Sequence, residues 1–581
     1  MPSLNWIGKE KIVNHDKDVP FRLMRKNKKY SLGNSENLIL EGDNLEALKA
    51  LMPFYYGKIK CIYIDPPYNT GNEKWKYNDN VNSPKIREWI GKTVGPEGDD
   101  LCRHDKWLCM MYPRLKLLYN LLSDDGVIFV SIDDNEHCNL KMVMDEIMPD
   151  MFVTTIHVQM STVQGQKVRP AKQGNIVKNA EYILVFSKNK KKNIGKNPLY
   201  DVAIYDQHYS LFLEKNTDDY KIKNLGEIIL KEEKILHHLK ELQIIKNIKI
   251  PKITGKIIAE AYSTSEIFRG FIHKNASKIA RYHDTTEVDE SNIEFKAKVV
   301  NGYAVKYKTK NRSYLITKDN KGAYKQLITL DEKIRKADDF RETFGVTTIR
   351  GDWWAGFYLD MGNVSKEGDT EYKNGKKPVR LIKQLIKFST DDNDLVLDSF
   401  AGSGTTAHAV LDLNKEDSGN RKFILVEMEK NIAKNITAER VKRVAKGYSY
   451  KKNGGEVVKV AGLGGGFEYV ELGEPLFDKD GMINKAVSFE DMARYVYFTE
   501  TKTNLEKKNI KGNCLGKFGG NYYFLLFDGI GKNILNRKFL QEIKKISGPK
   551  IVYADKCLLD EEILEKYQII FRQIPYQVKI Y

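Results

Sequence analysis

Short apolar runs alternate with stretches of helical spacing in two separate parts of this chain. In the first part, the runs Leu38–Leu40 and Ile59–Ile64 predict strands, and leucines spaced three apart predict a helix over Asp43–Leu51 between them. A helix over Lys106–Leu122 and a buried strand over Val127–Ile132 follow. Helices that alternate with buried strands indicate an α/β fold with a mainly parallel sheet.

The same alternation returns after residue 379. It predicts a helix over Val379–Phe388, a strand over Leu395–Asp398, a helix over Thr405–Leu413 and a strand over Phe423–Glu427. Between about 154 and 343 the rhythm is lost, lysines are dense, and tyrosines and arginines are interleaved. We therefore expect a separate basic module inserted into a doubly wound α/β domain.

These pattern changes give the expected division of the chain. The glycine- and lysine-rich stretch 447–466 predicts a linker, and a small α/β domain is expected after it. The expected parts are an N-terminal extension (1–36), one half of the α/β domain (37–153), the insert (154–345), the other half (346–446) and the C-terminal domain (467–581).

Charge adds a class of partner to this picture. The chain has 95 basic and 78 acidic residues, a formal net charge of +17, which favours binding to polyanions and above all to nucleic acid. Its six cysteines form no C-x-x-C pair and no cluster with zinc-like spacing, so no metal site is expected. We also expect a cytoplasmic protein, because the sequence shows neither a secretory signal nor a run of ~20 apolar residues.

The first candidate site is Asp65-Pro66-Pro67-Tyr68, directly behind the strand predicted over Ile59–Ile64. Open α/β sheets bind ligands at the carboxyl ends of their strands. The two prolines fix the direction of the Pro66 carbonyl, so that this carbonyl and Asp65 can both accept hydrogen bonds from one amino group. Tyr68 offers an aromatic face for stacking. The combination favours the handling of an amino group on a flat ring, although a plain proline turn has the same residues.

The second candidate site is the glycine turn Asp398–Thr406, between a predicted strand and helix. Glycines 402 and 404 let the backbone approach a ligand at a helix N-terminus, and Glu427 ends the next strand, where a carboxylate can accept from ribose hydroxyls. Taken by itself the turn fits a nicotinamide dehydrogenase, a methyltransferase or a tight turn without a ligand.

Together the two motifs resemble the β-type amino-methyltransferases of DNA, most narrowly the modification (Mod) subunits of type III restriction-modification systems. In that family the Asp-Pro-Pro-Tyr motif precedes a target-recognition region and the Phe-x-Gly-x-Gly motif follows it. Ser399 departs from the family, where Phe or Pro is common. The residues that carry the resemblance are Glu41–Leu48, Tyr63–Gly71, Val127–Asp134, Gly375–Pro378 with Leu381, Leu397–Thr406, Gly473–Phe477 and Val552–Lys556.

The resemblance implies a Rossmann-like methyltransferase fold that moves a methyl group from S-adenosylmethionine to the amino group of an adenine flipped out of double-stranded DNA. Asp65, Pro66, Pro67 and Tyr68 would form the catalytic site. It also implies a homodimer and a separate restriction subunit, since the chain has no Walker A motif. Trp75 and Tyr77, in the loop after the motif, can then close over the base. The residues implied for the cofactor are Asp43, Asp65, Lys377, Pro378, Asp398, Phe400, Ala401, Gly402, Ser403, Gly404, Thr405 and Glu427.

Three alternatives stay open from the sequence. Methylation of the cytosine amino group is one, although the relatives that do this more often carry Ser-Pro-Pro-Tyr. A DNA-recognition subunit with a vestigial catalytic site is another, and the intact motifs argue against it. A dehydrogenase would need neither Asp65-Pro66-Pro67-Tyr68 nor a basic insert.

Overall fold

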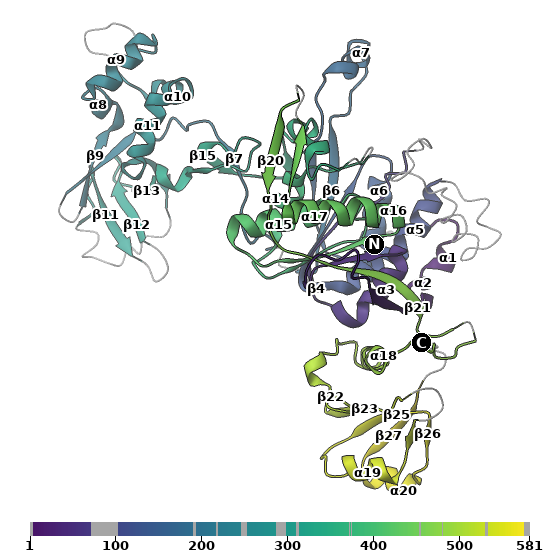
Figure 1. Ribbon diagram of the computed structural model, residues 1–581. Helices are drawn as coiled ribbons and strands as arrows, with labels where there is room; N and C mark the ends of the chain where they lie inside the picture. Colours follow the sequence, from purple (N-terminus) through teal and green to yellow (C-terminus); the bar gives the residue numbers. More distant parts are fainter. Residues whose placement is uncertain are drawn as a thin grey trace. The chain divides into compact units, whose positions relative to one another are not determined.

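The computed structural model divides the chain into two compact units, Met1–Asn197 with Asp352–Tyr581, and Pro198–Gly351 (Figure 1). We refer to them as unit 1 and unit 2. The structure describes residues 4–70, 103–189, 193–216, 219–245, 252–285, 298–308, 313–370, 372, 375–451, 455–478, 480–528 and 533–574.

A ten-stranded, mainly parallel sheet forms the centre of unit 1 among the described residues. Six adjacent strands, from β21 to β4, run parallel, whereas β6 is antiparallel to both of its neighbours. The expected fold class is therefore confirmed. The strands in sheet order are β1 (Arg22–Lys26), β21 (Glu468–Pro475), β2 (Leu38–Glu41), β18 (Lys422–Glu427), β17 (Leu395–Asp398), β3 (Ile59–Ile64), β4 (Leu122–Ile132), β6 (Ala180–Ser187), β5 (Phe152–Gln159) and β16 (Trp353–Trp354).

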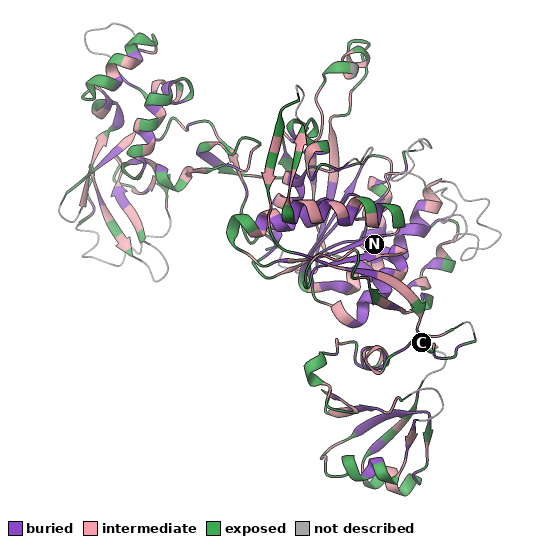
Figure 2. Cartoon of the chain, in the orientation of Figure 1, coloured by how far each residue is buried: buried purple, intermediate pink, exposed green. Residues whose placement is uncertain are grey.

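Helices cover both faces of this sheet, which explains why its central strands are apolar along their whole length. All six residues of β3 are buried. In β18, Ile424 and Val426 belong to the core that α3, α5 and α6 complete on one face of the sheet. The buried Phe423 and Leu425 lie outside that core. Figure 2 shows the buried residues along the sheet. The first group of helices is α3 (Asn44–Tyr55), α5 (Arg103–Leu121) and α6 (His137–Ile147); the second is α14 (Val379–Ser389), α15 (Thr405–Asp417) and α17 (Ala438–Lys446).

Unit 2 contains a closed six-stranded barrel and a group of short helices. Strands β11 and β12 form an antiparallel hairpin, and the barrel closes where β8 pairs with β10. The helices complete a separate core around Leu225, Phe268 and Ile272. Around the barrel the strands are β10 (Ile279–Asp284), β13 (Tyr324–Thr329), β12 (Ser313–Lys318), β11 (Tyr303–Lys308), β9 (Asp219–Asn224) and β8 (Leu211–Lys215); the helices are α8 (Leu225–Ile229), α9 (Glu233–Glu241), α10 (Gly255–Thr264) and α11 (Glu266–Lys274).

The boundaries of these parts differ from those expected from the sequence. Strand β6 and all but the first two residues of β5 fall inside the expected insert 154–345, yet both strands pair in the large sheet. Their antiparallel pairing produces no βαβ rhythm, which is why the pattern placed them outside the α/β domain. The predicted linker 447–466 is wrong as well, because it contains the hairpin β19 (Gly447–Lys451) and β20 (Val457–Ala461).

The C-terminal part begins later than residue 467, because β21 is a strand of the large sheet. Its own sheet has the order β22-β23-β25-β27 and carries short helices, the small α/β architecture that the sequence indicated. The elements of the C-terminal part are α18 (Phe489–Thr501), β22 (Cys514–Phe518), β23 (Asn521–Leu525), α19 (Arg537–Ile543), β25 (Lys550–Ala554), α20 (Glu561–Lys566) and β27 (Ile569–Gln573).

No helix among the described residues combines the length and the apolar composition needed to cross a membrane.

Candidate active site

The two motifs follow neighbouring parallel strands. Val396 and Leu397 of β17 pair with Cys61 and Ile62 of β3. Because the strands run in the same direction, their carboxyl ends meet at one edge of the sheet. Asp65 comes directly after β3, and Asp398 is the last residue of β17. Segments far apart in the sequence are thereby brought together.

Three contacts hold the proline turn in place. The indole Nε1 of the fully buried Trp107, from α5, donates to the Pro67 carbonyl at 2.7 Å. Asn69, with a left-handed φ of 56°, donates through its amide to the carboxylate of Glu136 and at 3.1 Å to the Arg103 carbonyl. Glu136 is fully buried. The backbone of the motif is thus fixed by α5 and by the start of α6.

A partly buried polar network surrounds Asp65. The Tyr68 hydroxyl lies 3.0 Å from Asp65 Oδ1 and 3.1 Å from Oε2 of Glu181, a residue of β6. The Lys377 ammonium donates to the Tyr68 hydroxyl and to Glu181 Oε2, both at 2.6 Å, and lies 3.5 Å from Asp65 Oδ1. Four side chains from three separate parts of the chain therefore meet at one point.

The charges of this network shift the pKa values of its members. Burial raises the pKa of Asp65, and Lys377 opposes that rise. Burial alone would lower the pKa of the Lys377 ammonium, but Asp65 and Glu181 outweigh it and raise that pKa. Burial would likewise raise the pKa of Glu181, but the contacts with Lys377 dominate and lower it. Lys377 is thus held as a cation between two carboxyl groups.

The glycine turn is built on a buried carboxyl group. Asp398 Oδ1 accepts from the Phe400 amide at 2.9 Å, and Oδ2 accepts from the Thr406 hydroxyl at 2.6 Å. Burial raises the pKa of Asp398 to about 7. Gly402 and Gly404 have φ values of 49° and 78°, in the left-handed region that favours glycine. A Cβ on Gly402 would come within 3.2 Å of the Tyr372 hydroxyl.

Glu427 and Asp43 lie at the next two strand ends, and both contact backbone amides. Glu427 accepts from the Gly402 amide through Oε2 and from the Glu429 amide through Oε1, each at 2.9 Å, and burial raises its pKa to about 7. Asp43 is the N-cap of α3, where its Oδ1 accepts from Leu45 N at 2.9 Å and Glu46 N at 3.3 Å. Both carboxyl groups therefore shape the turns around them.

A second buried network, which sequence reasoning missed, supports the glycine turn from α17. Arg440 Nη1 donates to the hydroxyls of Ser403 and Thr405, both at 2.8 Å. Its Nη2 lies 3.4 Å from Glu367, which accepts from the first amide of α14 at 3.2 Å. Burial lowers the pKa of Arg440 to about 10. Neither Arg440 nor Glu181 lies in a recognisable motif, so only the fold reveals their positions.

A cavity of about 30 Å³ joins the two motifs. Its volume is near that of one water molecule. Asp43, Pro66, Pro67, Tyr68, Pro378, Gly404 and Glu427 do not line it, although they belong to the predicted site. Trp75 and Tyr77 fall outside the described residues. The cavity is lined by Tyr63, Asp65, Tyr372, Gly375, Lys376, Lys377, Asp398, Phe400, Ala401, Gly402, Ser403, Thr405 and Thr406.

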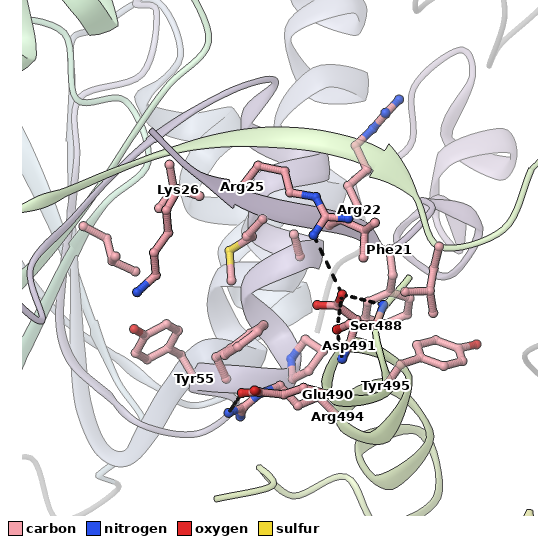
Figure 3. Close-up of a pocket in the computed structure, with 18 of the residues that line it drawn as sticks. Phe21, Arg22, Arg25, Lys26, Tyr55, Ser488, Glu490, Asp491, Arg494 and Tyr495 are labelled. Atoms are coloured by element: carbon pink, nitrogen blue, oxygen red, sulfur yellow. Dashed lines mark hydrogen bonds and ion pairs between the residues drawn. The ribbon is translucent and has the colours of Figure 1, made fainter. Parts of the chain in front are cut away.

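A larger cavity, of about 360 Å³, lies between β1, α3 and α18 and contains no residue of either motif (Figure 3). Its charged side chains all take part in ion pairs, and the partner lies outside the lining only for Arg22, which pairs with Glu46. Arg494 donates to Glu490 at 2.9 Å, and Arg25 lies 3.9 Å from Asp491. Charges that already neutralise each other leave little to attract a ligand, so we place the candidate site at the strand ends.

This chain is similar in sequence to a known protein family and to several curated proteins. Residues 59–439 match the model of a family described as DNA methylase. The Mod subunit of the probable type III restriction-modification enzyme HindVI of Haemophilus influenzae is 32% identical over 77% of this chain and 55% of its own length. The EcoP15I Mod subunit of Escherichia coli is 29% identical over 74% of this chain and 64% of its own length.

The chain thus spans roughly 55 to 65% of the length of these curated relatives. A putative DNA modification methylase from Thermus thermophilus, solved with S-adenosyl-L-methionine, is 14% identical with a TM-score of 0.28, over 70% of this chain and 95% of that chain. The cytosine-N4-specific PvuII DNA methyltransferase is 12% identical with a TM-score of 0.31, over 70% and 87%. At these scores the structural likeness carries no argument.

Proposed function

Because this chain belongs to the DNA methylase family, we propose that it methylates the exocyclic amino group of adenine in double-stranded DNA, with S-adenosylmethionine as the methyl donor. We also propose that it is the modification subunit of a type III restriction-modification system. The observation that carries the proposal is the meeting of Asp65 and the Asp398–Thr406 turn at adjacent strand ends, where both line one cavity.

The glycine turn suits the cofactor. Left-handed φ values at Gly402 and Gly404 expose backbone at the N-terminus of α15, where a bulkier residue would crowd Tyr372 or Thr437. The bound cofactor supplies a methyl group on a positively charged sulfonium. Because the cavity holds only about 30 Å³, some of the residues that line it have to move to admit S-adenosylmethionine. In this proposal the cofactor contacts Asp43, Lys377, Pro378, Asp398, Phe400, Ala401, Gly402, Ser403, Gly404, Thr405 and Glu427.

Asp65 and the Pro66 carbonyl bind the target amine. The nitrogen lone pair of adenine is delocalised into the ring, so two acceptors that hold its hydrogens favour a pyramidal nitrogen with an available lone pair. That lone pair forms the N–C bond while the C–S bond breaks and its electron pair stays on sulfur. One proton then leaves the nitrogen, and Asp65 Oδ2 is the nearest acceptor proposed. The enzyme contributes positioning and electrostatic stabilisation.

Recognition of DNA is assigned to unit 2 in this proposal. A hollow of about 720 Å³ on this unit is lined in part by Lys256, Arg281 and Tyr282, and Arg281 is paired with Asp206 at 2.9 Å. Cations and aromatic rings of this kind suit phosphates and bases. Binding there would supply the few kcal/mol that flipping a base costs, with Tyr68 as the stacking partner. A homodimer and a separate restriction subunit complete the proposed system.

The test is to incubate the purified chain with labelled S-adenosylmethionine and mixed-sequence DNA, and to identify the modified nucleoside. We expect N6-methyladenine from the wild type and a loss of at least 100-fold in Asp65→Asn. Asp124→Asn is the matched control, because Asp124 is exposed and lies near the start of β4, at the opposite end of the strands. N4-methylcytosine would identify the cytosine alternative, and equal activity of Asp65→Asn and wild type would refute the proposal.

A further inference from the structure

Lys377 connects the proline turn to a strand that neither motif contains. Its ammonium lies 2.6 Å from Glu181 Oε2 and 3.5 Å from Asp65 Oδ1, so it bridges β6 and the end of β3. Only about a tenth of the Lys377 side chain is exposed (10%). The ammonium also lies 4.7 Å from the centroid of the Tyr68 ring and 2.6 Å from its hydroxyl, which places it at the hydroxyl end of the ring.

The bridge acts on one oxygen of Asp65. Tyr68 and Lys377 both contact Oδ1. Among the residues that the structure describes, none makes a hydrogen bond to Oδ2. A carboxylate with one oxygen held by two partners cannot rotate without breaking both contacts. The second oxygen is therefore kept in one direction and retains its capacity to accept.

We propose that Glu181 and Lys377 are positioning residues of the methyl-transfer site: Glu181 anchors Lys377, and Lys377 holds Asp65 with Oδ1 toward Tyr68 and Oδ2 open to the target amine. This inference rests on the proposed function, because it assigns roles in that reaction. Neither residue transfers a proton or a methyl group. Both act through Asp65.

Several charged or titratable groups face Asp65, and the positive and negative ones shift its pKa in opposite directions. Lys377 lowers the pKa of Asp65, whereas burial and the Glu181 carboxylate raise it. The Tyr68 hydroxyl bonds to it, Tyr63 approaches from β3, and Asp398 approaches from β17. Removal of the Lys377 charge therefore raises the pKa of Asp65, and removal of the Glu181 charge lowers it. The two substitutions act in opposite directions.

The experiment measures single-turnover methylation rates against pH for wild type, Lys377→Met and Glu181→Gln. Only ionised Asp65 can accept from Tyr68 at Oδ1 and from the target amine at Oδ2 at the same time. The rate therefore falls on the acidic side of the profile. We expect this acidic limb to move to higher pH by at least one unit in Lys377→Met. At a fixed pH on the acidic limb of the wild type, the variant would then react at least tenfold more slowly. In Glu181→Gln we expect the limb to move to lower pH. Lys377→Arg should restore the wild-type limb.

Lys383→Met provides the matched control. Lys383 also lies between two carboxylates, 2.8 Å from Asp412 and 2.9 Å from Glu416, and belongs to α14, which begins two residues after Lys377. Its loss removes two ion pairs without contact to Asp65, so the limb should stay in place. Thermal unfolding, measured for each variant, reports whether it is folded.

The outcomes distinguish a failure of the proposed function from a failure of the positioning roles. If the wild type methylates no DNA, the proposed function fails. Two results with an active wild type would show that the positioning roles are wrong. In the first, the acidic limbs of Lys377→Met and Glu181→Gln lie at the same pH as that of Lys383→Met. In the second, both limbs move in the same direction. Should Lys377→Met not fold, Glu181→Gln decides: a downward shift supports the inference, and no shift or an upward shift overturns it.

Discussion

The indole of Trp107 provides the sharpest test of how the proline turn is held. Its Nε1 donates to the Pro67 carbonyl at 2.7 Å, and the ring is fully buried. Trp107→Phe removes this donor. A carbonyl left without its partner in a buried setting costs ~1–3 kcal/mol. Because Pro67 is only half-buried, water can replace part of the bond, and we expect the lower end of that range, about 1 to 2 kcal/mol.

The expected loss appears as a slower reaction. If the turn relaxes to solvate the carbonyl, Asp65 and Pro66 leave their positions, and 1 to 2 kcal/mol corresponds to a rate about 5 to 30 times lower. Trp6→Phe is the control. Trp6 packs in the same core, and among the described residues its Nε1 donates to the Cys109 sulfur alone, at 3.3 Å. Both variants lose a similar volume from the core.

The assay is the single-turnover methylation rate at saturating DNA and cofactor, with thermal unfolding measured in parallel. We expect both variants to lose stability through the smaller ring, and only Trp107→Phe to lose rate beyond about twofold. Equal rates in the two variants would show that the Pro67 bond does not position the turn.

Two further predictions concern the glycine turn. The folded-state pKa of Asp398 is about 7, above the ordinary value of 3.8, so the folded protein keeps a proton that the unfolded chain loses as the pH rises. Stability therefore falls with rising pH. Relative to Asp398→Asn, the wild type should lose ~2 kcal/mol of unfolding free energy between pH 5 and 7, because the slope of 1.36 kcal/mol per pH unit flattens as the pH reaches the folded-state pKa. The loss is seen as a growing difference in melting temperature, and a difference that is constant with pH would contradict it. Gly404→Ala places a Cβ at a φ of 78° and 3.1 Å from Thr437, which costs ~1–2 kcal/mol and should weaken S-adenosylmethionine binding about 5- to 30-fold by calorimetry. Gly57→Ala, at a φ of 64° with open space around it, should lose stability and keep its affinity.

The central strands and the two motifs could be predicted from the sequence because each carries a local signal. The six buried residues of β3 form one apolar run, and the left-handed glycines fall at the strand-to-helix turn that their spacing indicates. The helix predicted over Asp43–Leu51 is α3, and Asp43 is its N-cap.

The supporting residues carry no such signal. Glu181 looks like an ordinary acidic residue at the start of a strand until the antiparallel strand β6 places it beside Tyr68 and Lys377. Arg440 belongs to a helix whose sequence suggests a solvated charge, yet it is fully buried. Long-range pairing decides both positions, and periodicity along the chain cannot report it. The boundary of the insert was misplaced for the same reason.

The order of strands in the large sheet has a consequence for folding during synthesis on the ribosome. Strand β3 lies between β17 and β4, but β17 is made more than 300 residues later. At ~5–20 residues per second, one edge of β3 waits roughly 20 to 70 seconds for its neighbour. During that time Ile59–Ile64 has unpaired backbone N–H and C=O groups along this edge, between mostly apolar side chains. Translation of this protein should therefore depend on chaperones that shield such an edge until residue 398 has emerged.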